Sequence, residues 1–323
     1  MLILSERDVS ELLPAREYVP AMEEAYVAIS RGRIVHPDPA RLRFVFDGKR
    51  KISSMCAYDG TLGLVACKLP VRVPGNPDRG LPLVSATLLL WEAESGRLLA
   101  LIQATHLTEV RTAAGTAVAV RHLARKDASS LGIFGAGAQA RAHCALVRGV
   151  RDFKRIRVMA RSSATVETLV RTLPRDGCDI RVAQSAMEIL ACDVIICATS
   201  SRTPIVAGRD VRPGTLVVSI GATDPAAREV DSDLVCQATV VVDSRSAVLE
   251  EAGDLLIPIS EGRFSPISIH AEIGEVVGGV PGRRSDEEVI FFKGGGLAGQ
   301  DLVIGHRLYE EALKRKVGTI VEF

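Results

Sequence analysis

The chain has 323 residues, a length that predicts two domains, and its 47% hydrophobic and 24% charged residues are typical of a globular protein with a sizeable core. A net charge of +1 and an aromatic content of 4% argue against nucleic-acid and polyanionic partners. The seven cysteines form no C-x-x-C pair, and the N-terminus lacks the basic start and apolar run of a signal peptide, so we expect a cytoplasmic protein. No apolar run is long enough to span a membrane, and the histidines show no metal-ligand spacing, so no membrane association and no metal are predicted.

The N-terminal part predicts a short strand at residues 2–4 and a helix that Ser5 caps, with Asp8 completing a capping box. Pro20 is expected to open a second helix over residues 21–31. Alternating polar and apolar residues between turn-rich segments then predict an antiparallel sheet. Its strands are expected at residues 41–46, 52–58, 63–71, 84–91 and 98–103. A long helix over residues 105–125 follows, and the small residues around Thr112 would let a partner helix or a cofactor approach its backbone.

From residue 130 onward strands and helices alternate, which predicts a parallel sheet with helices on both faces. Strands are expected at residues 130–134, 156–159, 180–182, 194–198, 216–220, 239–242, 288–292 and 319–323, and helices at 139–147, 164–173, 186–191 and 298–316. Glu250, Glu251 and Asp254 are expected on one helix face. The fold class is therefore α/β, a Rossmann dinucleotide-binding domain joined to an α+β domain.

A glycine motif lies between the apolar strand 130–134 and the helix that follows it. Its pattern is G-x-G-x-x-A, in which Gly135 allows a tight turn, Gly137 lets a pyrophosphate approach the backbone, and Ala140 lets the helix pack on the strand. The predicted dinucleotide-binding residues are Gly135, Ala136, Gly137, Ala138, Gln139 and Ala140. The alternative is a tight strand–helix turn with no ligand.

The end of the second strand, near residue 160, bears on the choice of dinucleotide. No acid stands there to bind the ribose hydroxyls as in NAD enzymes. Arg161 could pair with a 2′-phosphate, and Ser162 and Ser163 could donate to it, so NADP is predicted over NAD. The alternative is that Arg161 is a solvated cation and NAD is bound. Thr199 and Ser200 follow another strand, where they could contact the nicotinamide ribose or cap a turn.

Six further motifs accompany the glycine motif. They are residues 63–68 (GLVACK), 74–82 (PGNPDRGLP), 110–114 (VRTAA), 221–231 (GATDPAAREVD), 270–276 (HAEIGEV) and 292–301 (FKGGGLAGQD). With these motifs the whole chain resembles the ornithine cyclodeaminase/mu-crystallin family. The resemblance implies a substrate-binding and dimerisation domain over residues 1–118, completed by residues 302–323, and a Rossmann domain over residues 119–301. It also implies a homodimer.

The resemblance implies chemistry through the imine of an amino acid and a nicotinamide cofactor, and the carboxylate of such a substrate needs Arg or Lys. Lys68 lies inside an apolar strand, where a lone ammonium is costly, and the resemblance makes it a carboxylate-binding or imine-polarising residue. The resemblance also places Arg111 and Arg41 on the substrate carboxylate. Met55 would line the pocket. The alternatives are a snorkelling Lys68, an ordinary ion pair of Arg111, and a core role for Met55.

The chain departs from the family pattern at Thr223. Ornithine cyclodeaminases carry an aspartate there that handles the substrate amino group, whereas here Asp224 follows one residue later. Either Asp224 takes that catalytic role from a shifted position, or it caps a turn before Pro225. Leu83 replaces the family's substrate-contacting threonine, which suggests a less polar pocket. Both departures argue against true ornithine cyclodeamination.

These observations favour an NADP-preferring reductase of small α-imino acids such as pyrroline-2-carboxylate. In this reading Lys68 and Arg111 hold the carboxylate, and Lys68 or a water molecule supplies the proton. The alternatives are an alanine dehydrogenase, an ornithine cyclodeaminase with tightly held NAD, and a non-catalytic protein that binds NADPH or another ligand as mu-crystallin does.

Overall fold

The computed structural model describes residues 1–322 and divides into two compact units. Unit 1 comprises Met1–Thr112 and the C-terminal segment from Gly296, and unit 2 comprises Ala113–Gly295. Helix α3 (Thr105–Leu123) passes from the first unit into the second. Both boundaries fall a few residues before those expected after residues 118 and 301. Within residues 1–322, no helix is long and apolar enough to cross a membrane.

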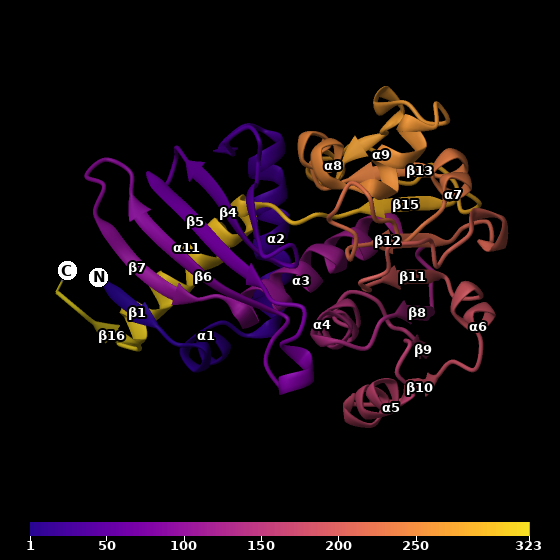
Figure 1. Ribbon diagram of the computed structural model, residues 1–323, viewed down its shortest axis with the longest axis horizontal. Helices are drawn as coiled ribbons and strands as arrows, with labels where there is room; N and C mark the ends of the chain where they lie inside the picture. Colours follow the sequence, from indigo (N-terminus) through magenta and orange to yellow (C-terminus); the bar gives the residue numbers. More distant parts are fainter. Residues whose placement is uncertain (323) are drawn as a thin grey trace. The chain divides into compact units, whose positions relative to one another are not determined.

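Unit 1 is built on one mixed sheet (Figure 1). The strand order is β16 (Thr319–Ile320), β1 (Leu2–Leu4), β7 (Leu98–Gln103), β6 (Val84–Glu92), β5 (Leu64–Arg72), β4 (Arg50–Asp59) and β2 (Ile34–Val35), and β3 (Leu42–Phe46) also pairs with β4. The pairs among β2 to β7 are antiparallel, which confirms the sheet predicted between residues 40 and 105. The terminal strand ends at Ile320, and the part of its expected range at Phe323 lies outside the described residues.

The helices of unit 1 are α1 (Glu6–Leu12), α2 (Ala15–Ser30) and α11 (Ala298–Arg315), with a short 3-10 helix at Pro77–Arg79. The predicted capping box of α1 is confirmed, because Ser5 and Asp8 exchange hydrogen bonds. The expected start of α2 after Pro20 is wrong. The helix begins at Ala15, and Pro20 lies inside it. The buried side chains Tyr18, Val19 and Met22 on both sides of the proline explain this, since their packing outweighs one missing backbone hydrogen bond.

The central strands of unit 1 alternate between a buried and a half-buried face. In β5, Leu64, Ala66 and Lys68 are buried, while the residues between them are half-buried. Helix α11 packs against β4, β5 and β6 (Figure 1). A strand places every second side chain on the same face, so Lys68 lies on the buried face with apolar neighbours.

Unit 2 contains the predicted parallel sheet. Its order is β10 (Asp179–Val182), β9 (Arg155–Met159), β8 (Ser130–Phe134), β11 (Val194–Cys197), β12 (Leu216–Ser219), β15 (Ile290–Lys293), β13 (Thr239–Val242) and β14 (Ala271–Glu272). Every adjacent pair is parallel. The first five strands therefore follow the 3-2-1-4-5 order of dinucleotide-binding folds, which confirms the α/β fold class with a Rossmann domain.

Short helices connect these strands. They are α4 (Ala138–Val147), α5 (Ser163–Thr172), α6 (Ala186–Leu190), α7 (Ser232–Gln237), α8 (Arg245–Glu251), α9 (Gly253–Ser260) and α10 (Ile273–Val277), with 3-10 turns at Gly208–Asp210 and Pro266–Ser268.

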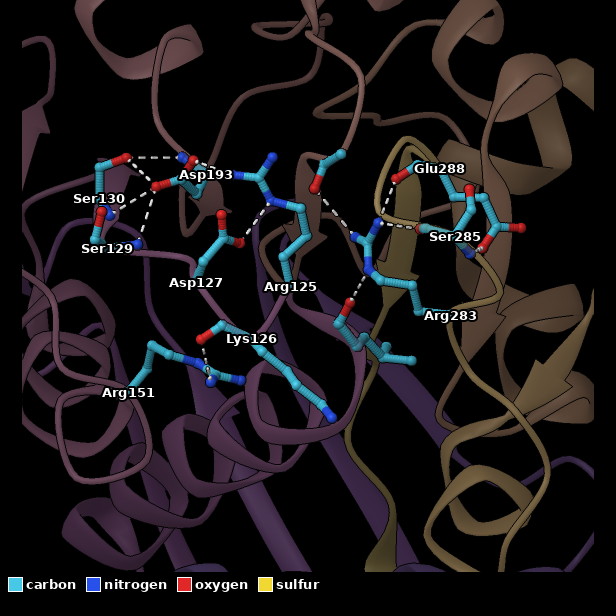
Figure 2. A network of polar contacts seen from close by, with 12 residues as sticks. Arg125, Lys126, Asp127, Ser129, Ser130, Arg151, Asp193, Arg283, Ser285 and Glu288 are labelled. Atoms are coloured by element: carbon cyan, nitrogen blue, oxygen red, sulfur yellow. Dashed lines mark hydrogen bonds and ion pairs between the residues drawn. The ribbon is translucent and has the colours of Figure 1, made fainter.

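A polar network fixes the amino-terminal edge of this sheet (Figure 2). Asp193, just before β11, accepts hydrogen bonds from the backbone N–H groups of Ser129 and Ser130 and from the Ser130 hydroxyl. Arg125 donates to the same carboxylate over 2.9 Å. Beside them, Arg283 donates to the carbonyl oxygen of Leu123, the last residue of α3, over 2.8 Å. The network ties the starts of β8 and β11 to the segment that follows α3.

We expect Asp193→Ala to lower the free energy of unfolding by about 3 kcal/mol, because it leaves several buried or half-buried hydrogen-bond donors without an acceptor. Asp127→Ala is the matched control. Asp127 also pairs with Arg125, over 3.2 Å, but its side chain is 77% exposed, against 18% for Asp193. It should cost under about 0.5 kcal/mol. Denaturant unfolding of both variants measures this, and equal losses would contradict the assignment.

Candidate functional site

Lys68 lies in β5 with 1% of its surface exposed. Its direct cross-strand neighbours are Met55 and Leu88, both buried. The Nζ atom lies 2.8 Å from both carboxylate oxygens of Asp301 in α11. Burial and then the charge of Arg111 lower the pKa of Lys68, Asp301 opposes both effects, and the result is a pKa of about 7. An amine with this pKa can gain and lose a proton near neutral pH.

Arg111, in α3, meets the same carboxylate. Its Nε atom donates to Asp301 over 3.0 Å, and its Nη1 atom donates to the Gln300 side chain over 3.2 Å. Gln300 is held in turn by the backbone N–H of Leu297, over 2.9 Å. Asp301 is fully buried between the two cations. When Lys68 is protonated, the three groups carry a net charge of +1, so the site favours an additional anion.

Gly296 allows this arrangement. Its φ of +80° is a backbone conformation that favours glycine, and a Cβ atom there would collide with Nη1 of Arg111. Its carbonyl oxygen also accepts a hydrogen bond from Nη2 of Arg41 over 3.0 Å. The structure thus brings Lys68, Arg111, Arg41 and Met55, which were predicted from the sequence, to the start of α11.

Three residues of this cluster were not singled out from the sequence. They are Asp301 and Gln300 in the first turn of α11, and His36, whose Nε2 atom accepts from the N–H of Gly299 over 3.0 Å. Burial lowers the pKa of His36, partly opposed by Asp301, so it serves as a neutral acceptor. Asp301 belongs to the glycine-rich motif at residues 292–301. However, an acid in the first turn of a helix is also explained by the helix dipole, so the residue type alone gave no sign of a site.

The glycine turn of unit 2 has the predicted geometry. Gly135 has a φ of +121°, and a Cβ atom there would collide with the carbonyl oxygen of Ala198. Gly137 is the N-cap of α4, with open space where a Cβ atom would lie, and no side chain caps the helix. Ala140 is fully buried. The free N–H groups at the start of α4 and the open glycine surface fit a dinucleotide pyrophosphate, with Ala136, Ala138 and Gln139 lining the turn.

A buried histidine, also missed from the sequence, braces this turn. His143 in α4 lies 2.9 Å from the Thr116 hydroxyl and 2.7 Å from the carbonyl oxygen of Gln139. Burial lowers the pKa of His143 to about 4, so the ring is neutral at physiological pH. We infer that it joins α3 to the start of α4 and keeps Gln139 in place.

The other predicted cofactor residues differ in their contacts. Arg161 and Ser163 are exposed after β9, and no hydrogen bond or ion pair of Arg161 is found among residues 1–322. The Ser162 hydroxyl caps α5 by accepting from Thr165. Thr112 donates its hydroxyl proton to Thr108, over 2.7 Å. The Thr112 hydroxyl proton is therefore used within α3, whereas the Ser162 hydroxyl only accepts in its contacts and Arg161 is available to a ligand.

The predicted site residues on the loops after β11 and β12 also differ in their contacts. The Thr199 backbone and hydroxyl both donate to Glu229, and Ser200 is exposed. Asp224 accepts from the N–H of Ala226 over 2.9 Å and pairs with Arg202 over 3.1 Å. These contacts match the alternative in which Asp224 caps a turn.

The prediction that Glu250, Glu251 and Asp254 lie on one helix face is wrong, because the helix is interrupted between α8 and α9. Asp254 lies beyond the break and is fully buried, and Glu251 is also buried. The break is at Ala252, which has an extended conformation with φ of −95° and ψ of 97°. Gly253 after it allows close packing, since a Cβ atom there would collide with the carbonyl oxygen of Ala227.

The model of the ornithine cyclodeaminase/mu-crystallin family matches residues 1–316. The chain belongs to this family. It is 35% identical over 326 residues to the alanine dehydrogenase of Archaeoglobus fulgidus, with 100% of this chain and 98% of the relative covered.

Two solved structures are similar over nearly the whole chain. One is the Δ1-pyrroline-2-carboxylate reductase of Thermococcus litoralis in complex with NADH and L-proline, at 36% identity and a TM-score of 0.95, with 99% of this chain and 100% of the other covered. The other is an archaeal alanine dehydrogenase dimer with bound NAD, at 34% identity and a TM-score of 0.93, with 100% and 99% covered.

We expect Asp301→Asn to destabilise the protein more at pH 6 than at pH 9. The pKa of Lys68 is about 7 in the folded chain and near 10.5 when unfolded, so the unfolded chain binds more protons and stability rises with pH in this range. Removing Asp301 lowers the folded pKa further and extends this rise below pH 7. The loss should be roughly 3 kcal/mol at pH 6 and smaller at pH 9.

Denaturant unfolding at both pH values measures this difference. Glu310→Gln, on the same helix with a side chain 52% exposed, is the control and should cost little at either pH. A loss for Asp301→Asn that does not change with pH would contradict the assigned coupling to Lys68.

Proposed function

We propose that the protein is an NAD(P)-dependent reductase of small α-imino acids, with cyclic ketimines such as Δ1-pyrroline-2-carboxylate as preferred substrates. The observation that supports this most strongly is the buried cluster of Lys68, Arg111 and Asp301, which has one positive charge in excess. An α-imino acid offers a carboxylate to that charge and, next to it, a nitrogen that must be protonated during reduction.

The carboxylate would be bound by donors that the cluster does not use internally. A guanidinium has five N–H donors, and Arg111 gives one each to Asp301 and Gln300. Asp301 already holds Lys68 and Arg111 in place, so binding of the substrate carboxylate does not need to order these two side chains. Rigid charged donors in a buried site bind a carboxylate strongly. Arg41 is proposed as a third carboxylate contact, and Met55 as an apolar wall beside Lys68.

Lys68 is the proposed proton donor. A reduced nicotinamide, when bound, would supply the hydride to the imine carbon, and Lys68 would supply the proton that the imine nitrogen needs. An ammonium with a pKa of about 7 can give up this proton near neutral pH and regain it from solvent. We assign no proton transfer to Asp224, because its carboxylate is engaged in a turn and with Arg202.

The relatives support this proposal and also a second candidate. L-Proline, bound in the Thermococcus litoralis reductase structure, is the hydrogenated form of pyrroline-2-carboxylate. The alanine dehydrogenase of Archaeoglobus fulgidus has comparable identity, so reductive amination of pyruvate is the second candidate. Thr223 in place of the cyclodeaminase aspartate argues against ornithine as the substrate.

The test measures the oxidation of NADPH and NADH by absorbance. The substrates are pyrroline-2-carboxylate, piperideine-2-carboxylate, or pyruvate plus ammonia. We expect a cyclic imine to give the fastest turnover. Lys68→Met should lower kcat at least about a hundredfold while the cofactor still binds, since general acid catalysis contributes this much. Faster turnover with pyruvate and ammonia would favour the alanine dehydrogenase, and cofactor binding without turnover on any substrate would contradict both.

We propose NADP as the preferred cofactor, because Arg161 is exposed after β9 where the 2′-phosphate would lie and no acid stands there. Arg161→Ala should raise KM for NADPH about tenfold and leave KM for NADH nearly unchanged, given the strength of a charge-assisted hydrogen bond. Arg171→Ala, an exposed arginine at the end of α5, is the control. Equal effects of Arg161→Ala on both cofactors would contradict the proposal that Arg161 binds the 2′-phosphate.

We also propose that the protein is a homodimer. The face of the unit 1 sheet that does not pack on α11 presents half-buried apolar residues, among them Val65, Leu69, Leu89, Trp91 and Leu101. A continuous apolar sheet face is typical of a protein interface. The archaeal alanine dehydrogenase is itself a dimer. Sedimentation analysis should give the mass of two chains, and the mass of one chain would contradict this.

A further inference from the structure

We propose that Glu229, Asp254 and Lys293 form a buried network of net negative charge that stabilises the oxidised, positively charged form of the nicotinamide bound to unit 2. This inference rests on the nicotinamide cofactor of the proposed function. All three side chains are completely buried. Neither the glycine turn nor the Lys68 cluster explains why the fold buries them.

The network lies at the carboxyl edge of the parallel sheet. Ser219 is the last residue of β12, Lys293 is the last residue of β15, and Thr199 follows β11. β11 and β12 are the fourth and fifth strands of the 3-2-1-4-5 order, which form the second mononucleotide half of the fold. The glycine turn after β8 belongs to the first half. The second half, above this network, is therefore where the fold receives the nicotinamide.

Hydrogen bonds join the three charged groups through Ser219. Lys293 Nζ lies 2.8 Å from Asp254, 3.1 Å from the Ser219 hydroxyl and 2.6 Å from the carbonyl oxygen of Ala222. The Ser219 hydroxyl is 2.9 Å from both Glu229 and Asp254. The other oxygen of Asp254 accepts from the backbone N–H groups of Glu229 and Val230.

The hydrogen-bond donors and acceptors around Glu229, Asp254 and Lys293 indicate the charge of the network. The three ammonium protons of Lys293 match its three acceptors. Ser219 has one proton for two carboxylates, and all remaining partners of Glu229 and Asp254 are donors. Glu229 accepts from two backbone N–H groups, and Asp254 accepts from two backbone N–H groups and the Lys293 ammonium. Hydrogen bonds from such donors favour the ionised form of a carboxylate. Two carboxylates and one ammonium leave a net charge of −1.

The same network holds the loops at the cofactor edge. Glu229 accepts from the N–H of Thr199 and from the N–H of Gly221, each over 2.8 Å. The two loops approach so closely that a Cβ atom on Gly221 would collide with the Thr199 carbonyl oxygen. At the end of β11, burial raises the pKa of Cys197, and the charges of Glu229 and Asp254 raise it further while Lys293 lowers it. The two carboxylates outweigh the ammonium there, so the local potential is negative.

This potential favours hydride donation. The imine carbon receives the hydride with its two electrons, the imine nitrogen receives a proton, and the nicotinamide ring is left with a positive charge. A fixed negative charge nearby stabilises that product and the developing charge that precedes it, without reorganisation. The bound reduced cofactor is thereby a stronger hydride donor than the free one.

The experiment compares the dissociation constants of NAD⁺ and NADH for the intact protein by fluorescence titration. Glu229→Gln neutralises the network while keeping the shape of the side chain. It should raise the ratio Kd(NAD⁺)/Kd(NADH) about tenfold, the size expected for one charge acting across a protein interior. Ser219→Ala is the matched control, since it removes the hydrogen bond between Ser219 and Glu229 without changing the charge, and its ratio should stay within about twofold of the wild type.

An unchanged ratio in Glu229→Gln, or an equal change in Ser219→Ala, would overturn the inference. If Glu229→Gln does not fold, the wild-type ratio decides: the network requires NAD⁺ to bind at least as tightly as NADH, and tighter binding of NADH would overturn it. A wild-type protein that binds neither form, nor NADPH, would instead refute the proposed function and the inference with it. Both constants come from the same protein, so a general loss of affinity cancels in the ratio.

Discussion

The rest of unit 1 depends on one buried carboxylate, Asp301, shared between Lys68 and Arg111. Two cations placed alone in an apolar interior would be strongly unfavourable, so the fold has to supply a counter-charge. It does so by bringing the C-terminal helix α11 back onto the strands formed near the start of the chain, and the Lys68–Asp301 contact spans 233 residues. The counter-charge is one short of the two cations. We propose that this shortfall makes the cluster a site for an anionic ligand as well as a structural link.

Unit 2 handles buried charge in the opposite sense. Its glycine turn leaves backbone N–H groups open to a pyrophosphate, while Glu229 and Asp254 outnumber Lys293 at the far half of the same sheet edge. An excess of positive charge around an imino-acid carboxylate and an excess of negative charge near a nicotinamide suit the two reactants of a hydride transfer. In both units the charges are fixed by hydrogen bonds before any ligand arrives, so binding requires little reorganisation.

The sequence was sufficient for the parts of the structure that depend on local pattern. Period-two alternation predicted the strands, the capping box predicted α1, and a lysine inside an apolar strand marked Lys68 as unusual. The sequence was insufficient where contacts between distant segments determine the structure. In the sequence, Asp301 is like any acid at the start of a helix, and only the fold brings it next to Lys68. Asp254 was expected on a helix face, but the break at Ala252 turns it into the interior. Pro20 was expected to open a helix, and packing around Tyr18 and Met22 carries the helix through it.

The most direct test of the substrate site is the titration of Lys68 by NMR of isotope-labelled lysine side chains, with Lys68→Arg used to assign the signal. We predict a midpoint near pH 7 in the free protein. We also predict a higher midpoint with L-proline and oxidised cofactor bound, because the carboxylate of the ligand adds negative charge beside the ammonium. A midpoint near 10.5, or one that L-proline does not move, would contradict the claim that Lys68 is a buried, carboxylate-binding proton donor.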